Sequence, residues 1–142
     1  MAACDEGTQT QRVVKTPPAL RAPAMLDWGV LGAVLALQRT QQARDELVQI
    51  CAGSLTDLGE RLGSAGTRDD REEIARVAHA IKGSALTIGA ARLSGLAHEL
   101  ERVARGPSPA PPERVHALIA STLEACELTA RELSDPTHRP QR

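Results

Sequence analysis

One histidine, His79, combines a reactive residue type with an unusual position. It lies in the stretch IARVAHAIKGSALTIGAARLSGLAHELE, residues 74–101, whose apolar residues recur at helical spacing. Successive helical residues turn by about 100°, which places His79 roughly 140° from the centre of the apolar stripe, on the open face of the helix. An imidazole is partly unprotonated near neutral pH, so one ring nitrogen can attack phosphorus. The pattern predicts an exposed nucleophilic histidine. The stripe itself comprises Ile74, Val77, Ala78, Ile81, Ala85 and Ile88.

The neighbours of His79 on this helix face suit a residue that carries a phosphoryl group. Ala75 and Gly83, one turn before and after, leave the imidazole uncrowded. A glycine inside a helix costs about 1 kcal/mol relative to alanine, a cost that the close approach of another molecule would offset. Arg76 and Lys82 can reach an anion attached to the ring. Ala75 and Leu86 are expected to supply exposed apolar surface for docking.

The rest of a phosphoryl-transfer site is absent from the sequence. We find no glycine-rich nucleotide loop and no acidic cluster that suggests a magnesium site. His79 is therefore interpreted as a carrier that depends on a partner for the remaining machinery.

The elements that must position His79 are predicted to be helices with short connections. Asp27 can cap a short helix that begins at Trp28, and Gly89 is placed to end the helix that carries His79. The longer helices are expected over about Gln41–Leu62, Asp70–Ile88, Ala90–Arg105 and Glu113–Leu133. The apolar positions of the first of these are Leu47, Ile50, Cys51, Leu55, Leu58 and Leu62. This pattern indicates an all-α, antiparallel helical bundle.

The segments between and outside these helices are rich in glycine, proline and polar residues. GSAGTRDD (63–70) is predicted to be a loop, and GPSPAPP (106–112) a stiff linker. Residues 1–25 and 135–142 are expected to be a disordered arm and a disordered tail, which leaves residues 26–134 as one domain.

Composition and charge exclude several functional classes. Only 1% of the residues are aromatic, so the core must consist of leucine, valine, isoleucine and alanine. The net charge of −1 gives no basic field for nucleic acid or an anionic membrane. The longest apolar run, GVLGAVLAL, is too short to span a membrane. Three widely spaced cysteines and no signal-peptide pattern favour a cytoplasmic protein.

Residues 78–101, AHAIKGSALTIGAARLSGLAHELE, resemble the histidine phosphotransfer (HPt) domain of two-component phosphorelays. The family pattern reads roughly A-H-x-[LI]-K-G-[SA]-[SA]-x-x-[LIV]-G-A-x-x-L-x-x-L-x-x-x-[LM]-E, and this sequence keeps every spacing. The helix order over about residues 26–133 also fits. Members often carry a phenylalanine in the helix before the loop, where this chain has Ile50 or Leu55.

The resemblance implies a fold, a reaction and a set of roles. The fold is a four-helix bundle with a short extra N-terminal helix. His79 is the phosphoacceptor, which receives a phosphoryl group from a receiver-domain aspartate and passes it to another receiver, and Lys82 stabilises the phosphate. Gly83 opens access to the ring. The residues expected to serve access and docking are Ala75, Arg76, Gly83, Ser84 and Leu86.

The same resemblance implies the partners and cofactors. The partners are response-regulator receiver domains and a hybrid histidine kinase. The receiver brings the magnesium ion, so the chain itself needs no cofactor, binds no metal and has no kinase activity. We expect a monomer.

Two alternatives remain. The chain could be a helical adaptor that docks a receiver or kinase without accepting phosphate, although loss of His79 would be the mark of such a protein. A metalloenzyme is disfavoured because an HExxH pattern is absent and the four histidines share no ligand spacing.

Overall fold

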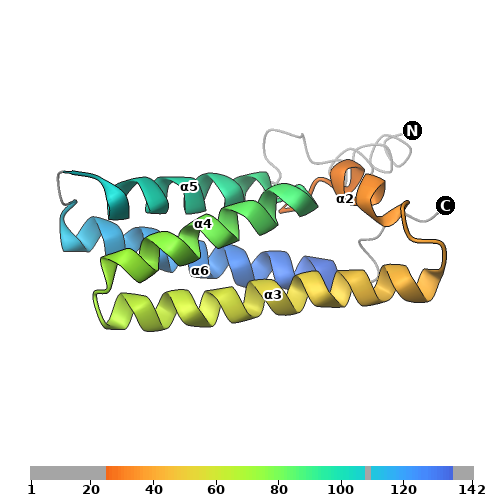
Figure 1. The fold of residues 1–142 in the computed structure, drawn as a ribbon, viewed down its shortest axis with the longest axis horizontal. Helices are drawn as coiled ribbons and strands as arrows, with labels where there is room; N and C mark the ends of the chain where they lie inside the picture. The colour runs from red at the N-terminus through yellow and green to blue at the C-terminus, as the bar shows by residue number, and fades with distance from the viewer. Residues whose placement is uncertain (1–24, 108–109, 136–142) are drawn as a thin grey trace, which may run out of the picture.

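The computed structural model describes residues 25–107 and 110–135, which form five helices and no strand. The all-α class predicted from the sequence is confirmed. The four longer helices lie alongside one another, and the short helix α2 packs at the end where α4 terminates (Figure 1). The helices are α2 (Trp28–Leu35), α3 (Gln41–Thr67), α4 (Arg71–Ile88), α5 (Ala91–Arg105) and α6 (Pro112–Ser134). The predicted arm and tail lie outside the described residues, except for Met25 and Asp135.

Polar caps fix where three of the helices begin. The Asp27 carboxylate accepts from the Gly29 amide at 2.9 Å, and the Thr40 hydroxyl accepts from Ala43 at 3.0 Å. Asp70 caps α4 in the same way, at 3.1 Å from the Glu73 amide. These side chains satisfy amides that have no partner within the helix, which is why Ser, Thr, Asp and Asn precede helices. The predicted start at Trp28 is confirmed.

Gly89 ends α4 and also allows α2 to approach. Its φ of 77° lies in the left-handed region, which favours glycine. A Cβ at this position would lie 2.8 Å from the carbonyl oxygen of Asp27, whose own amide donates to the Gly89 carbonyl at 2.8 Å. The predicted end of the helix at Gly89 is confirmed, and the same residue fixes the position of α2.

The predicted loop at 63–70 is wrong over most of its length, because α3 continues to Thr67. Two glycines suggested a break, but both face α6, and Gly66 does so across a close contact. A Cβ at Gly66 would lie 3.0 Å from Cδ1 of Ile119, and one at Gly63 would lie 3.9 Å from Leu123. Close packing against α6 therefore offsets the low helix propensity of glycine.

The core consists mostly of leucine, valine, isoleucine and alanine from all five helices, as the composition predicted, and also includes Cys126. Met25 is buried against it, so the predicted disordered arm extends one residue too far. Ile50, expected on the core face of α3, is instead 67% exposed. The buried stripe includes Val48 and Ala52. Ile50 lies two positions from each of them, so its side chain is rotated by about 200° around the helix, away from the core. Within the described residues, no helix is long and apolar enough to cross a bilayer.

Candidate functional site

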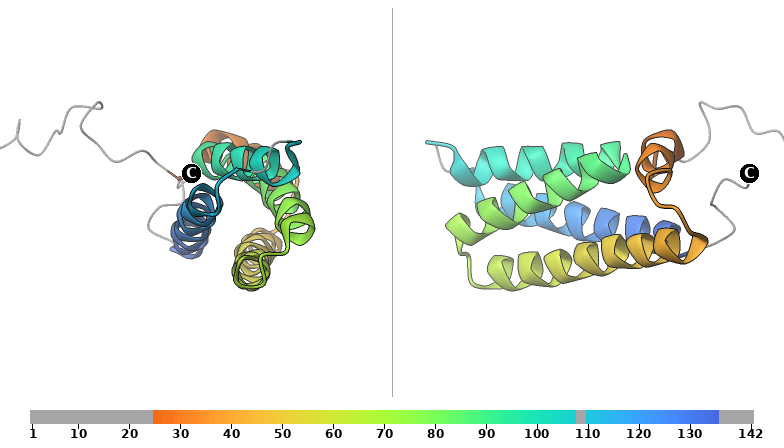
Figure 2. Two further views of the ribbon diagram at one scale, coloured as in Figure 1. Left: turned by 90° about the vertical axis from the view of Figure 1, so that its left-hand side faces the viewer. Right: turned by 45° about the vertical axis from the view of Figure 1, so that its right-hand side comes forward.

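His79 lies in the middle of α4 with its side chain 63% exposed. The six predicted residues of the apolar stripe are all buried, so the predicted orientation of α4 is confirmed. α4 packs most extensively against α5, and the two helices lie next to each other at an angle (Figures 1 and 2). The imidazole stands at the edge of this helix pair, where one side of the ring meets α5 and the other is open.

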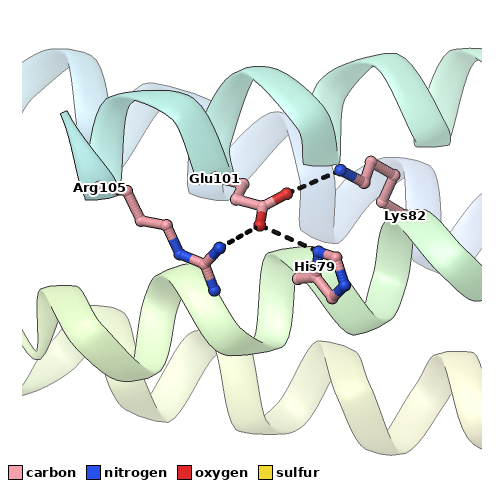
Figure 3. A network of polar contacts seen from close by, with 4 residues as sticks. All are labelled: His79, Lys82, Glu101 and Arg105. Carbon is pink, nitrogen blue, oxygen red and sulfur yellow. Dashed lines mark hydrogen bonds and ion pairs between the residues drawn. The ribbon is translucent and has the colours of Figure 1, made fainter.

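The side of the ring that meets α5 contacts one carboxylate, that of Glu101. Nδ1 of His79 lies 3.0 Å from Oε2 of Glu101. The other carboxylate oxygen, Oε1, accepts a hydrogen bond of 2.9 Å from Nζ of Lys82. Oε2 is also paired at 2.8 Å with Nη1 of Arg105. Glu101 is only 8% exposed and joins these three side chains into one network (Figure 3).

The network keeps Glu101 ionised. The hydrogen bond from Lys82, together with the charges of Lys82, His79 and Arg105, holds the pKa of this carboxyl below its ordinary value, although burial acts in the opposite direction. An ionised carboxylate can only accept hydrogen bonds. Nδ1 of His79 must therefore carry the proton that faces Oε2.

This proton leaves the second ring nitrogen, Nε2, with a free lone pair when the imidazole is neutral. Figure 3 shows Nε2 pointing away from Glu101 and Arg105. Glu101 thus favours the tautomer in which the exposed nitrogen has the free lone pair, and it can stabilise positive charge on the ring if Nε2 becomes bonded to an electrophile.

Lys82 and Ala75 are not on the open face, contrary to the prediction. The Lys82 side chain is 24% exposed and is held by Glu101, and Ala75 is only 2% exposed. Relative to Ile74 they lie about 80° and 100° around the helix, on the flank that α5 covers. Ala75 therefore cannot supply docking surface, and the ammonium of Lys82 is already paired.

The open face near His79 carries Arg76, Gly83 and Leu86, whereas Ser84 lies on the flank toward α3. A Cβ at Gly83 would meet no atom within 4 Å, so the space beside the ring is open, as predicted. Leu86 is a large exposed hydrophobic residue, and Arg76 is exposed, with Nε 3.8 Å from Glu73. Ser84 is half-buried and lines a cavity of about 180 Å³ between α3 and α4. The access and docking roles of these residues stay predictions.

Sequence reasoning assigned no role to Glu101 or Arg105. In the sequence, Glu101 is simply the last residue of the motif, 22 positions after His79. A usable signal was its register: it follows Ala97 by one helical turn, on the core side of α5, where a charged residue requires a partner. For Arg105 the only sequence signal is its position one turn after an opposite charge. In the described part of the chain, no group of three or more His, Cys, Asp or Glu side chains could hold a metal ion.

Comparison with protein families matches residues 46–131 to the Hpt domain. The match covers more than half of the 142 residues and includes both His79 and Glu101. No curated protein and no solved structure matches the chain. The resemblance drawn from residues 78–101 is thereby confirmed, and the chain belongs to the Hpt domain family.

Proposed function

We propose that this chain accepts a phosphoryl group on Nε2 of His79 from a receiver-domain aspartate and passes it to another receiver. Hpt domains act in phosphorelays as histidine phosphocarriers. The observation that carries the proposal is the placement of His79, with an exposed ring whose Nδ1 is held at 3.0 Å by a nearly buried carboxylate.

The proposed step balances without a base in this chain. The lone pair of Nε2 attacks phosphorus, the bond between phosphorus and the aspartate oxygen breaks, and the aspartate leaves as a carboxylate. The Nδ1 proton stays on the ring, which gains positive charge. Glu101 faces that charge and stabilises it. The reverse sequence transfers the phosphoryl group to the next receiver, and the receiver brings the magnesium ion.

Lys82 is proposed to stabilise the phosphoryl group from its place beside the ring. Its ammonium, a compact charge with three donors, is bound to Oε1 of Glu101 at 2.9 Å. The remaining donors are free to meet phosphate oxygens. Arg76, Gly83 and Leu86 on the exposed face of α4, together with Ser84 on the flank toward α3, are proposed to contact the receiver.

The finer features of the proposal follow the family. We propose an antiparallel four-helix bundle formed by α3–α6, with α2 as the extra N-terminal helix. The chain would work as a cytoplasmic monomer without kinase activity, between a hybrid histidine kinase and response regulators. The free thiols of Cys51 and Cys126 agree with a reducing compartment.

The test is label transfer from a panel of phosphorylated receiver domains of the same organism. The wild-type chain should take up label from at least one receiver, and His79→Gln should take up none, with an unchanged melting temperature. His98→Gln, which alters an exposed histidine on α5, is the matched control and should label normally. Label on His79→Gln would refute the assignment. Receiver binding without any labelling of the wild type would favour the adaptor alternative.

A further inference from the structure

Arg105 shares one oxygen atom with the reactive histidine. Its Nη1 lies 2.8 Å from Oε2 of Glu101, and the same Oε2 accepts the Nδ1 proton of His79 at 3.0 Å. Lys82 donates a hydrogen bond to the other carboxylate oxygen, Oε1. Arg105 lies one helical turn beyond Glu101 on α5, and its side chain is 56% exposed. The carboxylate that orients the imidazole therefore has two donors competing for one atom.

We propose that Arg105 is a positioning residue that weakens the hold of Glu101 on the Nδ1 proton of His79, and so favours release of the phosphoryl group from the phosphorylated ring. The predicted effect of Arg105 on phosphoryl transfer rests on the proposed function. The predicted effect of Arg105 on the Nδ1 proton does not depend on that function. The family pattern assigns no role to this position.

Arg105 is not needed to hold Glu101 in place. The carboxylate is nearly buried on a regular helix, and Lys82 fixes its other oxygen from α4. Competition for Oε2 is therefore the main effect of the guanidinium. An acceptor oxygen that serves a full positive charge has less electron density for a second donor.

The position of Arg105 around the ring determines the direction of the effect. Figure 3 shows its guanidinium on the Nδ1 side, with Nε2 facing away from it. When Nε2 carries a phosphoryl group, the positive charge on the ring is nearer to Arg105 than the phosphoryl oxygens are. The phosphoryl group carries about two negative charges but lies farther from the guanidinium than the ring does, so the direct attraction and repulsion largely offset each other. The direction is then set by the shared Oε2, because pairing with Arg105 weakens the stabilisation that Glu101 gives to the ring cation. Arg76, the exposed cation on α4, is directed toward Glu73 instead.

The first experiment needs no partner. Nitrogen-15 NMR of the histidine-labelled full chain at about pH 8.5, where a typical imidazole is neutral, gives the ratio of the two ring tautomers. In Arg105→Gln the ratio should move toward the Nδ1–H form by about two- to fivefold, the range of an exposed ion pair. Arg102→Gln removes the same charge from the same helix, but its partner is Glu99, so its ratio should match the wild type. An unchanged ratio in Arg105→Gln, a shift toward Nε2–H, or an equal shift in the control would overturn the proposal.

The second experiment uses a receiver domain that transfers label to His79. The receiver is first phosphorylated with acetyl phosphate, and the equilibrium distribution of the phosphoryl group between the receiver and His79 is then measured. Arg105→Gln should shift the equilibrium toward phosphorylated His79 by about two- to fivefold, and Arg105→Lys should restore the wild-type value within about twofold because it keeps the cation. Equal melting temperatures of the wild type and the two Arg105 variants would exclude a merely structural effect. An unchanged equilibrium in Arg105→Gln would refute the role in transfer. If no receiver labels the wild type, the proposed function fails, and the NMR ratio still decides whether Arg105 competes for Oε2.

Discussion

At the scale of single residues, the chemistry depends on which ring nitrogen of His79 carries the proton. The sequence identified His79 and its exposure, because a residue on a regular helix has an orientation that can be counted from its neighbours. It could not identify Glu101 as the residue that sets the tautomer, because that contact forms only when α5 packs against α4. For the same reason the predicted exposure of Lys82 and Ala75 was wrong. Helical spacing gives the direction of a side chain around its own helix, but it does not show whether a neighbouring helix covers that direction.

Replacing Glu101 tests its role in the reaction. In Glu101→Gln the ring loses the negative charge that faces Nδ1, while Lys82 and Arg105 remain beside it. We expect single-turnover phosphorylation of His79 to slow by about tenfold or more, since a hydrogen bond to a charged group contributes about 1.5–3 kcal/mol. Glu99→Gln is the control, because Glu99 pairs with two different arginines, Arg102 and Arg114, and not with any residue of the network around Glu101. An equal rate in both variants would show that Glu101 is dispensable.

Lys82 allows catalysis to be separated from docking. Its side chain is largely covered by α5, so Lys82→Ala should leave receiver affinity nearly unchanged. The transfer rate at saturating receiver should fall by about tenfold, because a cation next to the transferring group is lost. Lys82→Arg should keep part of the rate. The measurement is single-turnover transfer beside an independent binding titration. Weaker binding with a normal saturated rate would make Lys82 a docking residue instead.

At the scale of helices, caps and glycines predicted most boundaries but misplaced one. The start of α2 after Asp27 and the end of α4 at Gly89 follow from local hydrogen bonds and a local backbone angle, so the sequence alone contains them. The end of α3 does not, because Gly63 and Gly66 are tolerated in the helix through contacts with α6 that are more than 50 residues away in sequence. A glycine is a reliable stop only where the chain needs a left-handed conformation.

Gly83 is the glycine whose role belongs to access rather than packing. With no atom within 4 Å of an added Cβ, Gly83→Ala should stabilise the fold by up to about 1 kcal/mol through helix propensity. Gly83→Leu should remain folded and slow phosphotransfer severely, because its side chain projects beside Nε2. Gly53→Ala is the stability control, since Gly53 is equally open on α3. The measurements are urea denaturation and label transfer. Unimpaired transfer in folded Gly83→Leu would remove the steric explanation.

At the scale of the whole molecule, charged side chains connect helices that the apolar core already brings together. Glu99 on α5 pairs at 2.6 Å with Arg114 on α6, and with Arg102 on its own helix. Glu101 similarly joins α5 to α4. The amphipathic pattern predicted the helices and their core faces, whereas these connections depend on the relative rotation and register of the packed helices, which no single helix determines.

These connections predict how stability depends on pH. The hydrogen bond from Arg102, followed by that from Arg114, lowers the pKa of Glu99 from 4.5 to about 2. A carboxyl whose pKa is lower in the folded state stabilises the fold above its unfolded value, and this contribution is lost as the pH falls through the folded value. The melting temperature should therefore decline between about pH 5 and pH 2. Glu99→Gln should melt lower than the wild type at pH 7, with a shallower decline in acid. Glu124→Gln, an exposed glutamate of α6 outside these ion pairs, is the control. Parallel pH curves for the wild type and Glu99→Gln would show that the Glu99 pairs do not contribute to stability.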